Sequence, residues 1–251
     1  MKSIILAAGK GSRLGEITKT IPKGLVDING KSILERQISS FKRNDINDIV
    51  LVIGNFSDKY RFNDVTYLNG KESFEHNILF SLIEAKEEFN DDVIIAYGDI
   101  IFDDEIIKKL NKTKYDICLA VDMNWKDRYK KKSKFLVDHI CNVIIENNKI
   151  KNIGYRKNLN FQSDKMVGEF IGLMKFKKNS MKEFLRIYFE ILENHKGKFH
   201  ESPSIIEGII TDMIQEIIER NFEVNYVTID SKWCEIDTPE DLYEARKIFS
   251  V

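Results

Sequence analysis

The chain has 251 residues, with 39 lysines and arginines against 40 aspartates and glutamates, so its near-zero net charge gives no electrostatic basis for nucleic acid or a membrane surface as the main partner. Its three cysteines are widely spaced and form no C-x-x-C pair, which argues against a disulfide framework or a zinc site and fits a reducing compartment. No stretch reaches transmembrane length and the first residues read as a strand, so we expect one soluble, cytoplasmic domain over residues 1–251.

Strand and helix patterns alternate through the first half of the chain. Apolar, β-prone stretches predict strands at residues 3–8, 25–28, 48–54, 65–68, 92–99 and 115–123. Helical periodicity predicts helices from Ser32 to about residue 44, from Ser73 onward and over 103–110, and Ser32 with Glu35 forms a capping box. This order predicts an α/β fold with a doubly wound, largely parallel, Rossmann-like sheet, which binds ligands beyond the carboxyl ends of its strands.

The second half has a different pattern. The lysine-rich segment 126–134 is typical of a solvated loop, and a mobile lid over phosphates is the alternative. Two strands around Asn147-Asn148, within 142–153, and a third over 167–176 are expected to form a small antiparallel cover over the acceptor end of the cleft. The remaining elements are helices at 180–194 and 204–220, a strand at 222–229 and a helix at 238–249 that starts with Thr238 as N-cap and Pro239.

The helix predicted over 204–220 has an apolar pattern that indicates burial. Ile206, Ile210, Met213 and Ile217 share one face, and Ile205 and Ile209 lie beside them. We therefore expect this helix to be well buried.

A phosphate-binding pattern follows the first strand directly. In LAAGKGSRL (6–14), Gly9 and Gly11 allow a sharp turn that brings backbone N–H groups against an anion, and Arg13 adds a forked cation. Pro22 then places a second cation, Lys23, after a rigid backbone position. The dinucleotide fingerprint would need a glycine at Leu14, and the Gly-Lys-Ser/Thr of a P-loop is missing, so the segment favours another kind of triphosphate site.

Two aspartates occur where a cleft is expected. Asp99 ends an apolar strand in YGDI, and Asp237 lies in WCEID just before the capped terminal helix. Mg²⁺ bound to a triphosphate usually takes one or two protein carboxylates in addition to phosphate oxygens and waters. Each aspartate alone is equally compatible with turn chemistry, but beside a triphosphate site the pair predicts a metal site.

These motifs resemble the signature of the sugar-phosphate-type nucleotidyltransferases, LAAG-x-G-(S/T)-R-L followed by T-x-x-x-P-K, which TKTIPK (18–23) completes. The segments 168–176, 210–218 and 233–242 are similar to the branch of CTP-dependent cytidylyltransferases that act on phosphocholine, 2-aminoethylphosphonate or phosphoglutamine. The resemblance implies catalytic roles for Arg13 and Lys23 and a Mg²⁺ ion held by Asp99 and Asp237. It also implies transfer of CMP from CTP to a small phosphate or phosphonate with release of pyrophosphate, in the synthesis of capsule or cell-surface polysaccharide.

Further nucleotide contacts are expected around the glycine-rich loop and the cleft, from Leu6, Ala7, Ala8, Gly9, Lys10, Gly11, Ser12, Asn77, Ser81 and Gly98. Asn77 and Ser81 lie one helical turn apart, where an asparagine amide could read the edge of a pyrimidine, although an ordinary polar helix surface explains both residues equally well. Acceptors in this branch often carry an amine, so a carboxylate and aromatic faces are expected beside it. The candidates, each with an ordinary structural explanation as well, are Asp122, Trp125, Glu169, Trp233 and Glu235.

Two other functions remain open at this point. The first is a hexose-1-phosphate uridylyl- or thymidylyltransferase, although the E-K-P-type segment of those enzymes is not evident. The second is a non-catalytic, nucleotide-binding regulatory module, against which the retention of Arg13, Lys23, Asp99 and Asp237 argues. The identity of the acceptor and the oligomeric state, a homodimer included, are also open.

Overall fold

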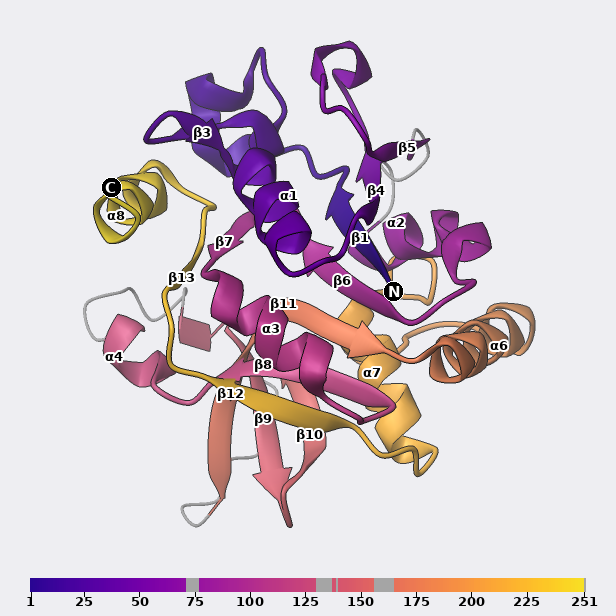
Figure 1. Cartoon of the computed structure of the whole chain (residues 1–251). Coiled ribbons are helices and arrows are strands. Elements are labelled where there is room, and N and C mark those ends of the chain that lie inside the picture. The colour runs from indigo at the N-terminus through magenta and orange to yellow at the C-terminus, as the bar shows by residue number, and fades with distance from the viewer. Residues whose placement is uncertain (71–76, 130–136, 139, 156–164, 251) are drawn as a thin grey trace.

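The computed structural model describes residues 1–70, 77–129, 137, 138, 140–155 and 165–250 (Figure 1). Four parallel strands form the centre of its sheet, in the order β6-β1-β4-β5. Their bounds are β1 Lys2–Ala7, β4 Asp48–Ile53, β5 Thr66–Asn69 and β6 Val93–Tyr97. The chain runs from β1 outward through β4 to β5 and then returns to the other side of β1. The strand order therefore reverses between β1 and β6, which is where α/β sheets bind ligands.

Antiparallel strands extend this sheet beyond β6. The strand β11 pairs antiparallel with β6, β8 and β9, while β9 and β10 form a hairpin and β12 runs parallel to β8. Their bounds are β8 Ile117–Asp122, β9 Cys141–Glu146, β10 Lys149–Tyr155, β11 Met166–Phe176 and β12 Asn225–Ile229. The predicted α/β fold with a mixed, largely parallel sheet is confirmed. The antiparallel strands continue the central sheet, however, and do not form a separate cover.

Helices cover both faces of the sheet because side chains of each strand alternate between them. On β1, Ile4 and Leu6 join the apolar core with α2, α6 and α7, whereas Ile5 and Ala7 join the opposite core with α1 and α3. The helices are α1 Ile33–Arg43, α2 Ile78–Glu84, α3 Asp104–Lys112, α6 Lys178–Asn194 and α7 Ile210–Glu219. The sheet is therefore doubly wound, as the alternating elements predict.

A third apolar cluster joins the two ends of the chain. It combines side chains of the N-terminal segment, such as Leu14 and Ile28, with Ile101, Ile236 and Leu242. The elements around it are β2 Asp27–Ile28, β3 Lys31–Ser32, β7 Ile100–Phe102, β13 Trp233–Glu235, α8 Pro239–Ile248 and the 3-10 segments Ser12–Thr18 and Lys23–Leu25. Pairing of β7 with β13 brings the C-terminal segment to the switch point between β1 and β6.

Most predicted elements occur close to their predicted bounds, and two differ. The helix predicted over 204–220 begins only at Ile210, because the Asp212 carboxylate accepts hydrogen bonds from the Ile209 and Glu201 amides and from the Ser202 hydroxyl. The predicted burial of Ile206 is wrong, since this residue precedes the helix and is 45% exposed.

The second difference concerns the helix expected from Ser73. Its described part begins at Ile78, after Asn77 as the N-cap, and the predicted start at Ser73 lies outside the described residues. In the lysine-rich segment, Trp125–Tyr129 forms the short helix α4, and residues 130–134 lie outside the described part, so the proposed lid is not tested there. Within the described ranges, every helix is too short or too polar to span a bilayer.

Candidate active site

The site lies where the glycine-rich loop leaves β1 and meets the turn after β6. The Gly98 amide donates to the Leu6 carbonyl at 2.9 Å, and a Cβ added at Gly98 would lie 2.6 Å from that oxygen and 2.8 Å from Ala7 Cα. A side chain would force the two segments apart. Gly98, predicted as a nucleotide contact, therefore has a definite structural role as the residue that brings the turn after β6 against the end of β1.

The glycine-rich loop is fixed against Lys23. Gly11 adopts a φ of +64°, and its carbonyl accepts hydrogen bonds from the Thr18 hydroxyl at 2.7 Å and from the Leu14 amide at 3.0 Å. A Cβ at Gly11 would lie 2.9 Å from Lys23 Cβ, so glycine lets the lysine stem pack directly on the loop. Of the predicted loop contacts, the strand-end residues Leu6, Ala7 and Ala8 are buried, whereas Gly9, Lys10 and Ser12 are exposed.

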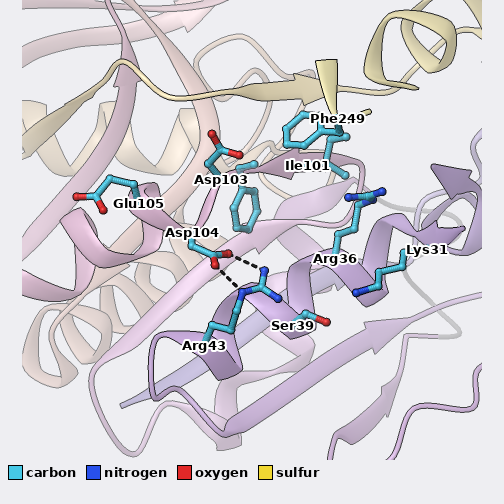
Figure 2. A pocket seen from close by; sticks show the side chains of 10 residues that line it. Lys31, Arg36, Ser39, Arg43, Ile101, Asp103, Asp104, Glu105 and Phe249 are labelled. Carbon is cyan, nitrogen blue, oxygen red and sulfur yellow. Dashed lines mark hydrogen bonds and ion pairs between the residues drawn. The ribbon is translucent and has the colours of Figure 1, made fainter. Parts of the chain in front are cut away.

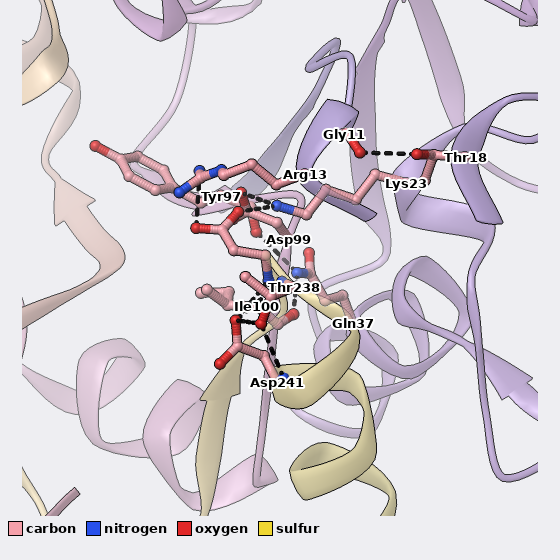
Figure 3. Close-up of polar contacts among 11 residues, drawn as sticks. Gly11, Arg13, Thr18, Lys23, Gln37, Tyr97, Asp99, Ile100, Thr238 and Asp241 are labelled. Atoms are coloured by element: carbon pink, nitrogen blue, oxygen red, sulfur yellow. Dashed lines mark hydrogen bonds and ion pairs between the residues drawn. The ribbon is translucent and has the colours of Figure 1, made fainter. Parts of the chain in front are cut away.

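Two cations and two carboxylates from distant parts of the sequence meet at this point (Figure 3). Lys23 Nζ lies 2.9 Å from Asp99 Oδ2 and 2.5 Å from Asp237 Oδ1, and Arg13 Nη2 lies 2.8 Å from Asp237 Oδ2. Burial alone would lower the pKa of Lys23, but the charges of Asp99 and Asp237 outweigh it and raise this pKa above its ordinary value. The ammonium of Lys23 is therefore held in its charged form.

Backbone pairing sets the two aspartates opposite each other. The Ile236 amide donates to the Asp99 carbonyl at 2.9 Å, next to the pairing of β7 with β13. On the other side of Asp237, the Asp241 carboxylate accepts from the Asp237 amide at 3.3 Å and the Thr238 amide at 2.9 Å, which completes the predicted cap of α8. The strand β13 was not predicted from the sequence, although it determines how Asp237 reaches the cleft.

A third carboxylate joins this pair. Ligand oxygens of Asp99, Asp237 and Glu235 all lie within 4.8 Å of one another. Glu235 is exposed to the cleft, and desolvation by the surrounding protein together with repulsion from Asp237 and Asp99 raises its pKa well above the ordinary value. Glu235 was predicted as an acceptor contact, and its position in the structure makes it a candidate metal ligand as well.

The carboxylate cluster has the chemistry that Mg²⁺ requires. All of its donors are hard oxygen atoms, and Asp99 Oδ1 is buried without a hydrogen-bond partner among the described residues. A buried, charged oxygen in this position is costly unless a cation or donor satisfies it. The residues present therefore fit the expected divalent cation.

The cluster opens into a cleft of about 1280 Å³. Of the predicted acceptor residues, Glu169, Trp233 and Glu235 line it, and Arg13 and Asp237 lie at the same cleft. Further lining residues, which sequence reasoning missed, include Tyr97, Tyr129, Tyr155 and Phe170. Tyr129 from α4 donates to Glu169 Oε1 at 2.7 Å, so a carboxylate and several aromatic rings share one chamber.

Two predicted acceptor contacts need correction, because Asp122 and Trp125 are buried and do not line the cleft. Asp122 Oδ2 accepts from the Trp233 indole at 2.9 Å, and its Oδ1 accepts from the Asn124 amide at 2.7 Å. The Trp125 indole donates to the Val167 carbonyl at 3.1 Å. Both side chains bind protein groups at strand ends, and the bond from Trp233 to Asp122 orients a ring that lines the cleft.

The two residues predicted to read the base lie at the start of α2. Asn77 is the exposed N-cap residue, and its side-chain amide donates to the Glu207 carbonyl. Ser81 is buried one turn later, so the two are one turn apart as expected. Base reading by this pair stays a prediction.

A second, smaller pocket of about 410 Å³ lies between α1 and α3 (Figure 2). Arg43 there makes two hydrogen bonds to Asp104, at 2.5 and 2.8 Å, and Arg36 donates to the Ile28 carbonyl at 3.1 Å. These cations are engaged by protein groups, as is usual for a solvated surface. The large cleft, with its cluster of charges at the switch point, is the better candidate for the active site.

Comparison with known proteins agrees with this geometry. The model of the MobA-like NTP transferase domain matches residues 3–130, which carry the glycine-rich loop, Lys23 and Asp99. The CTP:phosphoglutamine cytidylyltransferase of Campylobacter jejuni is 30% identical over 96% of this chain and 98% of its own length. The choline-phosphate cytidylyltransferase of Streptococcus pneumoniae is 33% identical over 46% of this chain and 52% of its own length.

The fold is also that of a solved nucleotidyltransferase. The structure of CTP:phosphocholine cytidylyltransferase from Streptococcus pneumoniae superposes with a TM-score of 0.72 at 18% identity, covering 99% of each chain. The site geometry, the family match and the relative that aligns along almost the whole chain agree. This chain therefore belongs to the MobA-like NTP transferase family and is a nucleotidyltransferase.

Proposed function

We propose that the protein is a Mg²⁺-dependent cytidylyltransferase that transfers CMP from CTP to the phosphate or phosphonate of a small acceptor and releases pyrophosphate. The observation that carries the proposal is the convergence of Lys23, Arg13, Asp99 and Asp237 at the edge of the cleft. The use of CTP is supported by the relative from Campylobacter jejuni, whose alignment covers 96% of this chain.

Asp99 and Asp237, with Glu235 beside them, would hold the metal ion. When bound, Mg²⁺ neutralises charge on the triphosphate and stabilises negative charge that develops during transfer. The chain itself contributes positive charge and alignment. The glycine-rich loop offers backbone to the phosphates, and Arg13 and Lys23 stand beside the carboxylates where the reacting phosphorus would lie.

Chemistry of this kind needs no general base from the protein. The attacking phosphate or phosphonate oxygen of the acceptor is already anionic at neutral pH. Because the charges of Asp99 and Asp237 raise the pKa of Lys23, this residue stays a cation and is unsuited to remove a proton. Lys23 is therefore assigned to electrostatic stabilisation.

The cleft also suits an acceptor with a positive group. Glu169 supplies a carboxylate, and Trp233, Tyr129 and other aromatic rings line the same cleft. An ammonium is stabilised by a carboxylate and an aromatic face together. The proposed acceptor therefore carries an amine or quaternary ammonium in addition to its phosphate or phosphonate.

The nucleotide is tested by measuring pyrophosphate release with CTP, UTP, ATP and GTP against a panel of phosphorylated and phosphonate acceptors. We expect CTP with a small non-sugar acceptor to give the highest kcat/KM. If UTP or dTTP with a hexose 1-phosphate is the best pair, the protein remains a nucleotidyltransferase but the proposed substrates are wrong.

The acceptor is tested with matched compounds, such as 2-aminoethylphosphonate and its uncharged 2-hydroxyethyl analogue. The amine should react with a kcat/KM higher by about tenfold or more, which corresponds to about 1.4 kcal/mol. Glu169→Gln should reduce this ratio without changing the KM for CTP, because Glu169 is proposed to contact the acceptor and is not among the expected nucleotide contacts. Glu146→Gln, which removes a carboxylate paired with Lys165 outside the cleft lining, is the matched control. Equal rates for both compounds with the wild type would refute recognition of an amine.

A further inference from the structure

A buried side-chain amide holds the turn that carries Asp99 (Figure 3). Gln37, on α1, is 1% exposed, and its Nε2 donates to the Tyr97 carbonyl at 2.8 Å and the Ile100 carbonyl at 2.6 Å. These carbonyls stand on either side of Gly98 and Asp99, at the end of β6 and the start of β7. One amide group thus spans the whole connection between the two strands.

This arrangement is poorly explained by packing alone. Gln37 Oε1 is buried without a hydrogen-bond partner among the described residues, although both Nε2 donor bonds are made. Burying an amide with one half unsatisfied costs free energy that an apolar side chain of similar size would avoid. The two donated bonds are therefore the feature that distinguishes glutamine from an apolar residue here.

Through this turn, Gln37 helps to fix the position of the Asp99 carboxylate. Asp99 is the central residue between the two held carbonyls, and its own carbonyl accepts from the Ile236 amide at 2.9 Å. Its side chain then reaches Lys23 at 2.9 Å and comes near Asp237. With Tyr97 and Ile100 fixed on one side and Ile236 on the other, the Asp99 carboxylate has a defined place in the cluster.

We propose that Gln37 is a positioning residue for Asp99, which acts from α1 through the Tyr97 and Ile100 carbonyls. The inference rests on the proposed role of Asp99 as a ligand of the divalent cation. Residues that orient metal ligands typically affect metal affinity or activity by about 10- to 100-fold when they are replaced. Gln37 never touches the substrate in this account, so its effect should pass through the metal.

The test compares metal binding with stability in Gln37→Met, which keeps the length of the side chain but removes both donors. Gln37→Glu, close in shape to glutamine, is the second variant and takes the place of Gln37→Met if that protein does not fold. Ile38→Val is the control, since it alters the neighbouring buried position on α1 and leaves the Gln37 amide and its two donor groups in place. Binding of Mn²⁺ to each protein with saturating CTP is measured by electron paramagnetic resonance, together with kcat, both KM values and the thermal midpoint.

We expect both Gln37 variants to weaken Mn²⁺ binding by about 10- to 100-fold and to lower kcat at fixed metal. The KM for the acceptor should change less than the Mn²⁺ affinity, since Gln37 itself does not line the cleft. Ile38→Val should lower the thermal midpoint with Mn²⁺ affinity unchanged. Wild-type Mn²⁺ affinity in the Gln37 variants, whatever their stability, would overturn the inference and leave the proposed function intact. If Asp99→Asn also bound Mn²⁺ like the wild type, the metal assignment itself would fail.

Discussion

Asp99→Asn and Asp237→Asn should each fold and yet lose almost all turnover, by at least about 10³-fold. An amide carries no charge and cannot replace a carboxylate as a Mg²⁺ ligand beside a triphosphate. Each change also removes one of the two aspartate carboxylates that pair closely with Lys23, so the charge of the cluster differs from that of the wild type. The measurement is kcat with CTP and the best acceptor, alongside circular dichroism to verify folding.

Asp104→Asn is the matched control, because this aspartate pairs with Arg43 at the start of α3 and lies outside the cleft lining. It should keep wild-type activity. EDTA should abolish the activity of the wild type, and added Mg²⁺ should restore it. Full turnover of either site variant, or of the wild type in EDTA, would be incompatible with the assignment of Asp99 and Asp237 as metal ligands.

Lys23→Met should lower kcat by about 10²- to 10³-fold, with a smaller change in the KM for CTP. Methionine keeps an unbranched stem that can pack against Gly11. It removes the ammonium that is proposed to lie beside the reacting phosphate. The variant also leaves the half-buried Asp99 and Asp237 without their shared cation, so some loss of thermal stability is expected too.

Steady-state kinetics separate the two roles that Lys23 could have. A group that acts on charge developing in the transition state changes kcat, whereas one that only holds the substrate changes KM. Lys19→Ala is the control, since Lys19 is exposed in the same N-terminal segment and pairs only with Glu16 among the described contacts. An unchanged kcat with a raised KM for CTP would reduce Lys23 to substrate binding.

The sequence predicts the central part of this fold well because its signals are local. Continuous apolar runs and the Ser32–Glu35 capping box determine β1, β4, β6 and α1, and Asn147 and Asn148 adopt the positive φ angles of a tight hairpin turn. The start of α7 depends instead on the Asp212 carboxylate, which reaches the chain 10 and 11 residues earlier. Helical periodicity therefore extended the predicted helix too far and misplaced Ile206.

In the candidate site, too, residues with a local sequence motif were predicted, and residues that depend on long-range contacts were not. Arg13, Lys23, Asp99 and Asp237 were predicted from motifs, and the fold brings them together across more than 200 residues. Asp122 and Trp125 were placed in the cleft by residue type alone, although their hydrogen bonds go to Trp233 and Val167. Tyr129 and Gln37 carry no motif, since their roles depend on which carboxylate or carbonyl the fold places opposite them. Asp241, whose carboxylate binds the Asp237 amide, is different, because its capping box with Thr238 is a local sequence signal.

Attack of the acceptor on the α-phosphorus of CTP can be tested directly with labelled nucleotide. The protein is incubated with the best acceptor and either [α-³²P]CTP or [γ-³²P]CTP, and the products are separated by chromatography. The α label should move quantitatively into the cytidylylated acceptor, and the γ label should leave as pyrophosphate. Transfer of the γ label to the acceptor, or its release as orthophosphate, would contradict nucleotidyl transfer by this site.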